Sequence, residues 1–452
     1  MMRKCSVTPL LLLAVVVPVL VLSAGTASAD EAAYTKTGAV GIPGGFNSAD
    51  IVFVDPVAGV LLMADRTNKS VDVVDLDLLP PGGTETTARQ FKPGLQGPVV
   101  HGSITNGVCT NATDNEVSGP NGVVTVNHRE IWVTDAPPGI PHLCPSTGFT
   151  PTGDSTITVL DLRTGTVLDT IHNGGNHRAD EAAFDPRHQI FIVANPADEP
   201  FPFVTLISTI PDASGHHPII KKIFFDGGHG PNHALAVDPA NGLEQPTWDP
   251  KTGNFFMAVP SFGLGAAAGA GGVVEITTHG NMRVTRVFVV PDCTPQGTAL
   301  GPDDELFLGC NASPPDVVGR VVVLNIRTGA QTSIPDIKGG CDEVWFDKFS
   351  NHFLGACHQG VPATSGPQVL GSIDADPIKF DGNAATNPGN AGGRIHALAA
   401  DDFTGRVFVA APGPGKNTLC TNTSPPNGCL LIFTPGPLDS DDRSDEGRRD
   451  RR

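Results

Sequence analysis

Seven segments of the chain repeat one pattern, and this repetition limits the possible folds more than any other feature. Each segment opens on a polar residue or Gly and continues as a short apolar strand, a turn and a second apolar strand. The turn is Asp-Pro at residues 55–56, 185–186 and 249–250. The seven opening residues are Asp50, Gly122, Asp180, Glu244, Gly297, Asp342 and His396. The pattern predicts similar units that differ mainly in loop length.

A third apolar strand follows every pair, and a fourth follows the first six. The seventh set ends at Phe433, whereas residues 34–42 stand alone before the first repeat. Pairing residues 34–42 with residues 430–433 would complete the seventh set and hide both free sheet edges. We therefore predict an all-β fold, a seven-bladed β-propeller of four-stranded blades closed by its N- and C-terminal strands.

The composition favours the same class. The 452 residues include 53 Gly and 41 Pro, and only 17% are charged. Long amphipathic helices need sustained charge and few breakers, so many short strands joined by turns are expected instead.

Both ends of the chain are expected to lie outside the propeller, which would span residues 30–438. Arg3 and Lys4 precede an apolar run at residues 10–22, and Ala27-Ser28-Ala29 offers a small-residue cleavage site. That run is too short to span a bilayer comfortably. Residues 1–29 are therefore predicted to be a secretory signal, and residues 439–452, which lack apolar side chains, a disordered charged tail.

The cysteines agree with export. One of the nine, Cys5, would leave with the signal, and an even number in an exported protein predicts disulfides. We expect sequential pairing, with the last three pairs each bracketing one hairpin or turn. The expected pairs are Cys109–Cys144, Cys293–Cys310, Cys341–Cys357 and Cys420–Cys429.

The strand–Asp-Pro–turn–strand units resemble the seven-bladed propellers of the YVTN/YncE-like group, neighbours of the NHL and SMP-30/gluconolactonase propellers. The resemblance covers roughly residues 34–434, and the tetrapeptide of that group is represented by variants such as residues 192–195, Ile-Val-Ala-Asn. It implies the architecture. Propellers host binding modules, lactonases, lyases and scaffolds alike, so it implies no single activity.

The aligned opening residues define a candidate site. The first strand of each blade lines the channel of a propeller, so these residues should form a ring near one mouth. Converging carboxylates take up protons or hold a cation. Oxygen ligands suit Ca²⁺ or Mg²⁺, and an imidazole extends the choice to Mn²⁺ or Zn²⁺. The candidate metal ligands are Asp50, Asp180, Glu244, Asp342 and His396.

Structural interpretations of the same residues remain open. Ring carboxylates can be hydrated or accept loop N–H groups, and Gly122 and Gly297 can serve ligand entry or close packing. Strand alternation would turn Glu181 and Glu343 away from the axis toward a neighbouring blade. There they would orient the ring residues from behind or form salt bridges between blades.

Histidines in the loops are weaker candidates. His177, His229 and His233 lie in Gly-containing loops that enter the third and fourth blades and could act as ligands or general bases. His101 and His142, with His358, carry less weight. Any of these side chains can simply be solvated.

Three functions follow. The first is a secreted propeller, extracellular or periplasmic, that binds a divalent cation, a small ligand or both at the channel mouth. The second is a metal-dependent lactonase, esterase or lyase, in which a ring metal polarises a carbonyl or activates water. The third is an extracellular interaction scaffold.

Several partners are not expected. A formal net charge of −18 disfavours nucleic acid and anionic lipid, and no second stretch is suited to crossing a membrane. Missing P-loop and dinucleotide-binding motifs argue against a nucleotide or flavin. A small molecule or an extracellular protein is the expected partner of a monomer.

Overall fold

The chain divides into two units, Met1–Glu31 and Ala32–Arg452, and the account below concerns the second. The predicted signal at residues 1–29 and the predicted tail at residues 439–452 lie outside the described residues. The computed structural model describes residues 34–79, 84–230, 232–239, 242–263, 270–311, 320–337, 340–358, 368–387, 394–413, 417–420 and 428–436.

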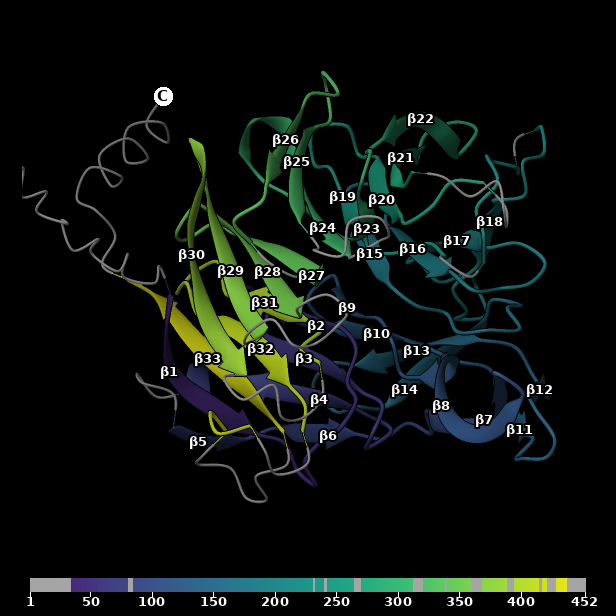
Figure 1. Ribbon diagram of the computed structural model, residues 1–452. Coiled ribbons are helices and arrows are strands. Elements are labelled where there is room, and N and C mark those ends of the chain that lie inside the picture. The colour runs from purple at the N-terminus through teal and green to yellow at the C-terminus, as the bar shows by residue number, and fades with distance from the viewer. Residues whose placement is uncertain are drawn as a thin grey trace, which may run out of the picture. The chain divides into compact units, whose positions relative to one another are not determined.

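Seven antiparallel sheets form the propeller, and each begins at one of the seven repeats (Figure 1). Blade 1 contains β2 (Val52–Asp55), β3 (Val60–Asp65), β4 (Ser70–Asp75) and β6 (Arg89–Phe91). Blade 2 contains β9 (Val123–Val126), β10 (Glu130–Asp135), β13 (Thr156–Asp161) and β14 (Val167–His172). Blade 3 contains β15 (Ala182–Asp185), β16 (Ile190–Asn195), β17 (Phe203–Ser208) and β18 (Ile219–Phe224).

The next three blades follow the same order of strands. Blade 4 contains β19 (Pro246–Trp248), β20 (Phe255–Val259), β21 (Gly272–Thr277) and β22 (Arg283–Val289). Blade 5 contains β23 (Thr294–Leu300), β24 (Glu305–Asn311), β25 (Val321–Asn325) and β26 (Gln331–Ile334). Blade 6 contains β27 (Gly340–Asp347), β28 (His352–His358), β29 (Gln368–Ala375) and β30 (Ile378–Asn387).

Blade 7 joins the two ends of the propeller, as the repeat predicts. It contains β31 (Leu398–Ala400), β32 (Val407–Ala411), β33 (Cys429–Pro435) and β1 (Tyr34–Gly41). Strand β1 pairs antiparallel with β33, from Tyr34 opposite Pro435 to Gly41 opposite Cys429. A fifth strand, β5 (Thr84–Thr87), adds in parallel to β1 and was not predicted.

The first strands of successive blades are neighbours all the way round, and β31 of blade 7 contacts β2 of blade 1. Apolar side chains fill the space between blades. In one such cluster Trp132 of blade 2 packs on Phe191 of blade 3, with ring centroids 4.7 Å apart. The ring is therefore closed, and sheet-on-sheet burial holds it together.

The Asp of the turn between the first two strands has two tasks. In blade 1, Asp55 Oδ1 accepts the N–H groups of Val57 (3.0 Å) and Ala58 (2.9 Å), which fixes the turn. Its other oxygen accepts the Thr125 hydroxyl of blade 2 at 2.6 Å. This carboxylate shapes one hairpin and ties it to the next blade.

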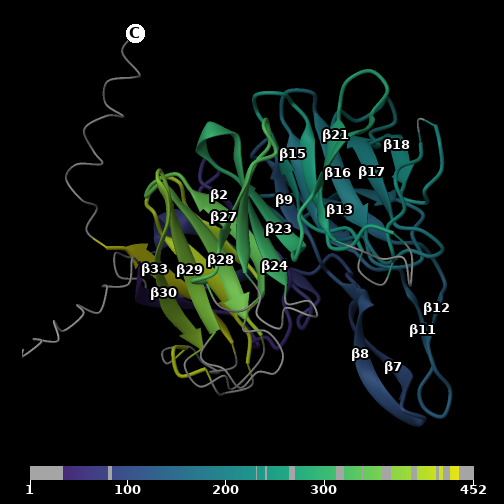
Figure 2. The same ribbon diagram turned by 45° about the horizontal axis from the view of Figure 1, so that its top comes forward.

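Two extra hairpins project from the blade 1–blade 2 side of the propeller (Figure 2), and we call residues 97–119 and 139–151 together the arm. The first hairpin pairs β7 (Gly97–Thr105) with β8 (Val108–Gly119), and the second pairs β11 (Gly139–Pro141) with β12 (Phe149–Pro151). Asn106 and Gly107 at the first turn both have positive φ, as the tightest hairpin turns require. The propeller repeat did not predict the arm.

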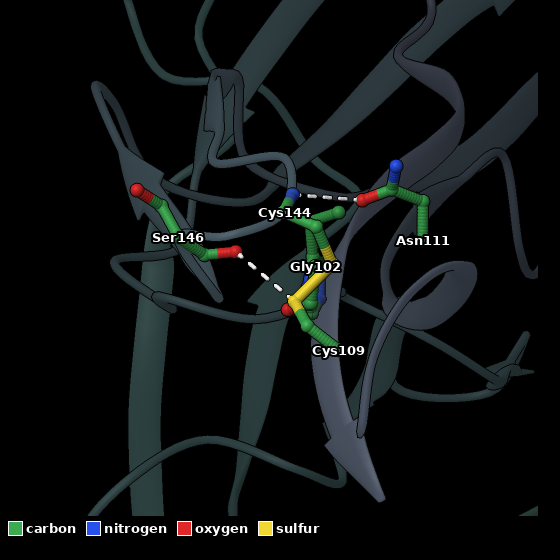
Figure 3. Close-up of a disulfide and its surroundings, with 6 residues drawn as sticks. Gly102, Cys109, Asn111, Cys144 and Ser146 are labelled. Atoms are coloured by element: carbon green, nitrogen blue, oxygen red, sulfur yellow. Dashed lines mark hydrogen bonds between the residues drawn. A yellow bond between two sulfur atoms is a disulfide. The ribbon is translucent and has the colours of Figure 1, made fainter. Parts of the chain in front are cut away.

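A disulfide between Cys109 and Cys144 joins the two hairpins of the arm (Figure 3). Beside it, the Asn111 side-chain oxygen accepts the Cys144 N–H at 2.9 Å, and Cys109 Sγ lies 3.8 Å from the Ser146 carbonyl oxygen. All four predicted pairings are confirmed; the others are Cys293–Cys310, Cys341–Cys357 and Cys420–Cys429. Four disulfides are compatible with an oxidising compartment.

Helical structure is minor. Within the described ranges the helical segments are 3₁₀ turns of three residues, such as Leu76–Leu78 and Pro302–Asp304. In the part of the chain that the structure describes, no helix has the length and apolar character needed to cross a membrane.

Candidate functional site

The predicted ring residues meet at the channel. His396 lies between two of them, with Nδ1 3.6 Å from Asp50 Oδ1 and Nε2 3.4 Å from Asp342 Oδ2. Asp180 is reached through Arg178, whose guanidinium lies 3.0 Å from Asp180 and 3.7 Å from Asp50. Side chains from blades 1, 3, 6 and 7 therefore form one charged group.

Two arginines that were not predicted neutralise half of this ring. Arg66, at the end of β3, forms an ion pair with Asp50 and donates to the Asn121 side-chain oxygen. Arg178 contacts Asp180 and also pairs with Glu116 of β8 at 3.1 Å. Burial opposes the Arg178 charge, but attraction from Asp180, Glu116 and Asp50 outweighs it and keeps the Arg178 pKa well above its usual value. Arginine thus supplies charge that a metal was expected to supply.

The two Gly positions of the ring serve close packing. A Cβ added at Gly122 would lie 2.4 Å from the Asp180 carbonyl oxygen of the next blade. A Cβ at Gly297 would lie equally close, 2.4 Å, to the Asp342 carbonyl oxygen. Neither contact leaves room for a side chain, so Gly here allows neighbouring blades to approach.

Glu181 and Glu343 correct the prediction that they turn toward neighbouring blades. Their carboxyl groups lie within hydrogen-bonding reach of each other, although blades 3 and 6 carry them, so both point into the channel. They are 4% and 2% exposed. Strand alternation failed at Glu343 because β27 carries a register shift between Cys341 and Val344.

These acids form an excess of buried acceptors. Glu181 Oε2, Asp180 Oδ1 and both carboxyl oxygens of Glu343 have no hydrogen-bond donor among the described residues. Burial raises the pKa of Asp180 to about 7. Burial and neighbouring carboxylates also hold the pKa values of Glu181 and Glu244 well above the usual range, as burial does for Glu343. Asp180, Glu181 and Glu343 are buried, and the arginines of the described residues pair with only some of the acids.

The blade 6 side of the cluster behaves differently. Burial would raise the pKa of Asp342, but His396 and His358 outweigh it and hold that pKa far below its usual value. His358 is buried, lies 3.5 Å from Asp342 and contacts Arg394 at 2.8 Å. His358 was predicted to be a weak candidate, yet it belongs to the cluster.

We call this set the channel cluster. Its members are Asp50, Arg66, Glu116, Arg178, Asp180, Glu181, Glu244, Asp342, Glu343, His358, Arg394 and His396. Across the described residues, no three His, Cys, Asp or Glu side chains are grouped as ligands of a metal ion. The five-residue metal site stays a prediction. Ion pairs with Arg66 and Arg178 already occupy oxygens of Asp50 and Asp180.

The loop histidines lie apart from the cluster. His233 Nδ1 pairs with Asp226 at 2.8 Å, and His229 is exposed in the same loop. His142 contacts the Thr150 hydroxyl inside the arm at 2.8 Å. His177 lies near Asp198, with Nδ1 3.7 Å from its carboxylate. The structure brings none of these four to the ring acids.

A cleft of about 540 Å³ opens beside the cluster, between the arm and blade 3. His101 and Asp114 of the first hairpin line it, as do His177 and Glu199. Glu116 and Arg178, which link the arm to the channel, are close in sequence to these residues. His101 was a weak candidate in the sequence, and nothing in the propeller repeat pointed to this cleft.

Comparison with known proteins supports the fold and no more. No protein-family model matches the chain, and no curated protein matches it. A chain of the solved structure titled "Crystal Structure of Mitotic Checkpoint Complex" is similar to it with a TM-score of 0.56 and 11% identity, covering 95% of this chain and 99% of that chain. The described protein is thus a seven-bladed β-propeller, while the YVTN/YncE-like assignment stays a prediction.

Proposed function

We propose that this chain is a secreted, monomeric binding propeller whose channel mouth takes a small ligand that brings positive charge. The excess of buried acceptors supports the proposal most directly. Apart from the contact between Glu181 and Glu343 themselves, the described residues offer no donor to either carboxyl oxygen of Glu343 or to one oxygen each of Glu181 and Asp180. A bound cation or amine would supply what the protein side chains lack.

The ligand set would differ from the one that the repeat predicted. Arg66 and Arg178 already pair with Asp50 and Asp180, and a metal ion beside two guanidinium groups is disfavoured by repulsion. Among the described residues, no ion pair is formed by Glu181, Glu244 or Glu343. The described side chains are not grouped as the ligand set of one metal ion, so an organic amine, or a cation that keeps part of its water shell, would bring positive charge to these carboxyl groups.

Calorimetric titration of chelator-treated protein tests the proposal, with CaCl₂ and 1,4-diaminobutane as separate probes. We expect at least one probe to bind, and Glu343→Gln and Glu244→Gln to weaken that binding about tenfold or more, about 1.4 kcal/mol. Asp303→Asn is the control, because this exposed residue lies in the turn of blade 5 at the other end of its first strand. Unchanged binding in both Gln variants, or no binding of either probe, would refute the proposal.

A scaffold is the second candidate, and the arm favours it. Ile104 and Val108 near the turn of the first hairpin are 62% and 61% exposed, and Ile140 and Leu143 of the second are 55% and 54% exposed. Exposed apolar side chains gathered on one projection are typical of protein contacts. Replacing Ile104 and Val108 with Ser should then abolish binding to an extracellular protein partner while calcium or diamine binding persists.

A further inference from the structure

The cleft between the arm and blade 3 has the size and lining of a small-molecule site, separate from the channel. Its volume of about 540 Å³ lies within the range of ligand pockets. The arm forms one side, and the loop that leads into blade 3 forms the other together with the β16–β17 loop of that blade. The cleft therefore exists only because the two hairpins of the arm are held in place, in part by the Cys109–Cys144 disulfide.

One wall of the cleft is apolar. Phe149 and Pro151 of β12 lie on it, and the buried side chain of Val117 from β8 adds to it. An aromatic ring beside aliphatic groups favours a ligand with an apolar body. A sugar or a bare ion would leave this wall without a partner.

A basic group faces the cleft from blade 3. His177 lies 3.7 Å from Asp198, and that carboxylate is fixed by the Asn176 N–H at 2.7 Å. Asp198 raises the pKa of His177, so the ring carries more positive charge near neutral pH than an ordinary histidine. Asn176 also lines the cleft and brings amide donors. His177 and Asn176 together suit an anionic group such as a carboxylate.

His101 is not available to a ligand in the same way. Its Nε2 lies 2.7 Å from Asp114, and its Nδ1 lies 3.0 Å from the Gly102 carbonyl oxygen. Both partners are acceptors, so both ring nitrogens carry a proton. The positive charge of His101 is therefore paired with Asp114, within the arm. His101 and Asp114 hold the shape of this side of the cleft.

A free carboxylate lies close to His177. Glu199 lines the cleft, is exposed, and is near enough to raise the pKa of His177 through charge. Asp114, although paired with His101, adds further negative charge on the arm side. An ammonium group would therefore be attracted to Glu199 and the arm side of the cleft.

Positive, negative and apolar groups thus line one cleft of small-molecule size. We propose that this cleft binds an α-amino acid with an apolar side chain. The ammonium group would contact Glu199, the carboxylate would contact His177 and Asn176, and the side chain would pack on Phe149. This site is independent of the channel proposal, because none of its four contact residues belongs to the channel cluster.

Isothermal titration with three related probes tests the inference. L-phenylalanine carries both charges, phenethylamine only the ammonium and 3-phenylpropionate only the carboxylate. We expect L-phenylalanine to bind about tenfold more tightly than either single-charge probe, because each charge has its own partner. Equal affinities for the three probes, or no binding of L-phenylalanine or of L-leucine, would overturn the inference.

Two variants assign the charges to residues. Glu199→Gln should weaken the binding of L-phenylalanine and of phenethylamine about tenfold and leave the binding of 3-phenylpropionate unchanged. His177→Gln should weaken the binding of L-phenylalanine and of 3-phenylpropionate about tenfold and leave the binding of phenethylamine unchanged. Glu343→Gln in the channel should leave L-phenylalanine binding unchanged, which separates this site from the channel site. Loss of L-phenylalanine binding in Glu343→Gln would contradict the assignment. Unchanged affinities for all three probes in both cleft variants would contradict it as well.

Discussion

The carboxyl groups of Glu181 and Glu343 meet inside the channel, although blades 3 and 6 carry them and 162 positions separate them in the sequence. Two ionised carboxylates cannot donate to each other, so the contact requires a proton on one of them. The centre of the propeller therefore gains a hydrogen bond only while that proton is present.

Glu343→Gln should stabilise the metal-free propeller at alkaline pH. A raised pKa in the folded state means stability that is complete below the ordinary glutamate pKa of about 4.3 and lost as pH rises through the folded value. The amide supplies a permanent donor to Glu181, so we expect a gain of about 1–3 kcal/mol near pH 8 and a smaller change near pH 5.

Urea unfolding in chelator at both pH values measures this effect, with Asp303→Asn as the control. Equal shifts at the two pH values would show that the two acids do not share a proton. A loss of stability near pH 8 would contradict the prediction outright.

Arg178→Gln should destabilise the propeller by about 3–5 kcal/mol, because it leaves Asp180 and Glu116 without their cation. The matched control is Arg286→Gln. Arg286 is 40% exposed, lies 3.8 Å from Glu275, donates to the Ile326 carbonyl oxygen at 2.8 Å and stacks on Phe288, so its loss leaves no buried charge unpaired and should cost clearly less than the loss of Arg178. Denaturant unfolding compares the two variants, and similar losses in both would argue against Arg178 as the centre of the cluster.

Tyr34 should remain protonated until the protein unfolds. It is the only tyrosine, its hydroxyl donates to Asp347 at 2.9 Å and lies 2.6 Å from the Ser350 hydroxyl, and burial with Asp347 raises its pKa well above the usual value. Phenolate absorbance should therefore appear together with the loss of β-sheet circular dichroism as pH rises. Ionisation at an ordinary tyrosine pKa in folded protein would contradict the β1–blade 6 contact.

Tyr34→Phe should lower the unfolding free energy by about 1–3 kcal/mol, because it leaves Asp347 with one fewer donor. Ser350→Ala is the companion variant, since it removes the other side-chain donor to Asp347 at 2.7 Å. Thermal unfolding of the two single variants and of the double variant measures the loss of unfolding free energy. An additive double variant would indicate that the three groups are not coupled.

Gly102→Ala should loosen the arm without unfolding the blades. The added Cβ would lie 2.1 Å from the Ser146 carbonyl oxygen and 3.0 Å from the Cys144 nitrogen, so the hairpins must separate. We expect faster reduction of Cys109–Cys144 by dithiothreitol and little change in the main thermal transition. Gly107→Asn is the control, because nothing lies near that position and Asn tolerates its positive φ. Equal reduction rates would show that the arm has room for the methyl group.

The repeat was sufficient to predict the propeller, because each unit carries its own strands and turn. The Asp-Pro turns and the apolar alternation located the blades, and the unpaired strand at residues 34–42 located the closure. Even the disulfides followed from sequential pairing, because three of the pairs lie within one hairpin or turn and the fourth joins two neighbouring hairpins. The arm was missed because it lies outside the repeat and has no counterpart in the other blades.

The site was predicted only in part. Aligning the repeats identified the acids that face the channel. The alignment compares only equivalent positions of the seven repeats, so it missed the charged side chains at other positions that pair with these acids. Arg178 stands two residues before Asp180, and this spacing on an extended segment was the available signal. Arg66 and Glu116 had no such signal, because their distances to the ring depend on how blades and arm pack. Glu343 was misplaced because a local register shift cannot be read from alternation.

The pairing of β1 with β33 sets an order of events for the nascent chain. Cys109–Cys144, Cys293–Cys310 and Cys341–Cys357 join cysteines 16 to 35 positions apart, so each can form while later blades are still being synthesised. The first strand, by contrast, must wait for nearly the whole sequence before its antiparallel partner β33 exists, and until then only the short parallel strand β5 can pair with it. A stop codon between Cys357 and β33 would thus leave three disulfides able to form and the first strand without its antiparallel partner.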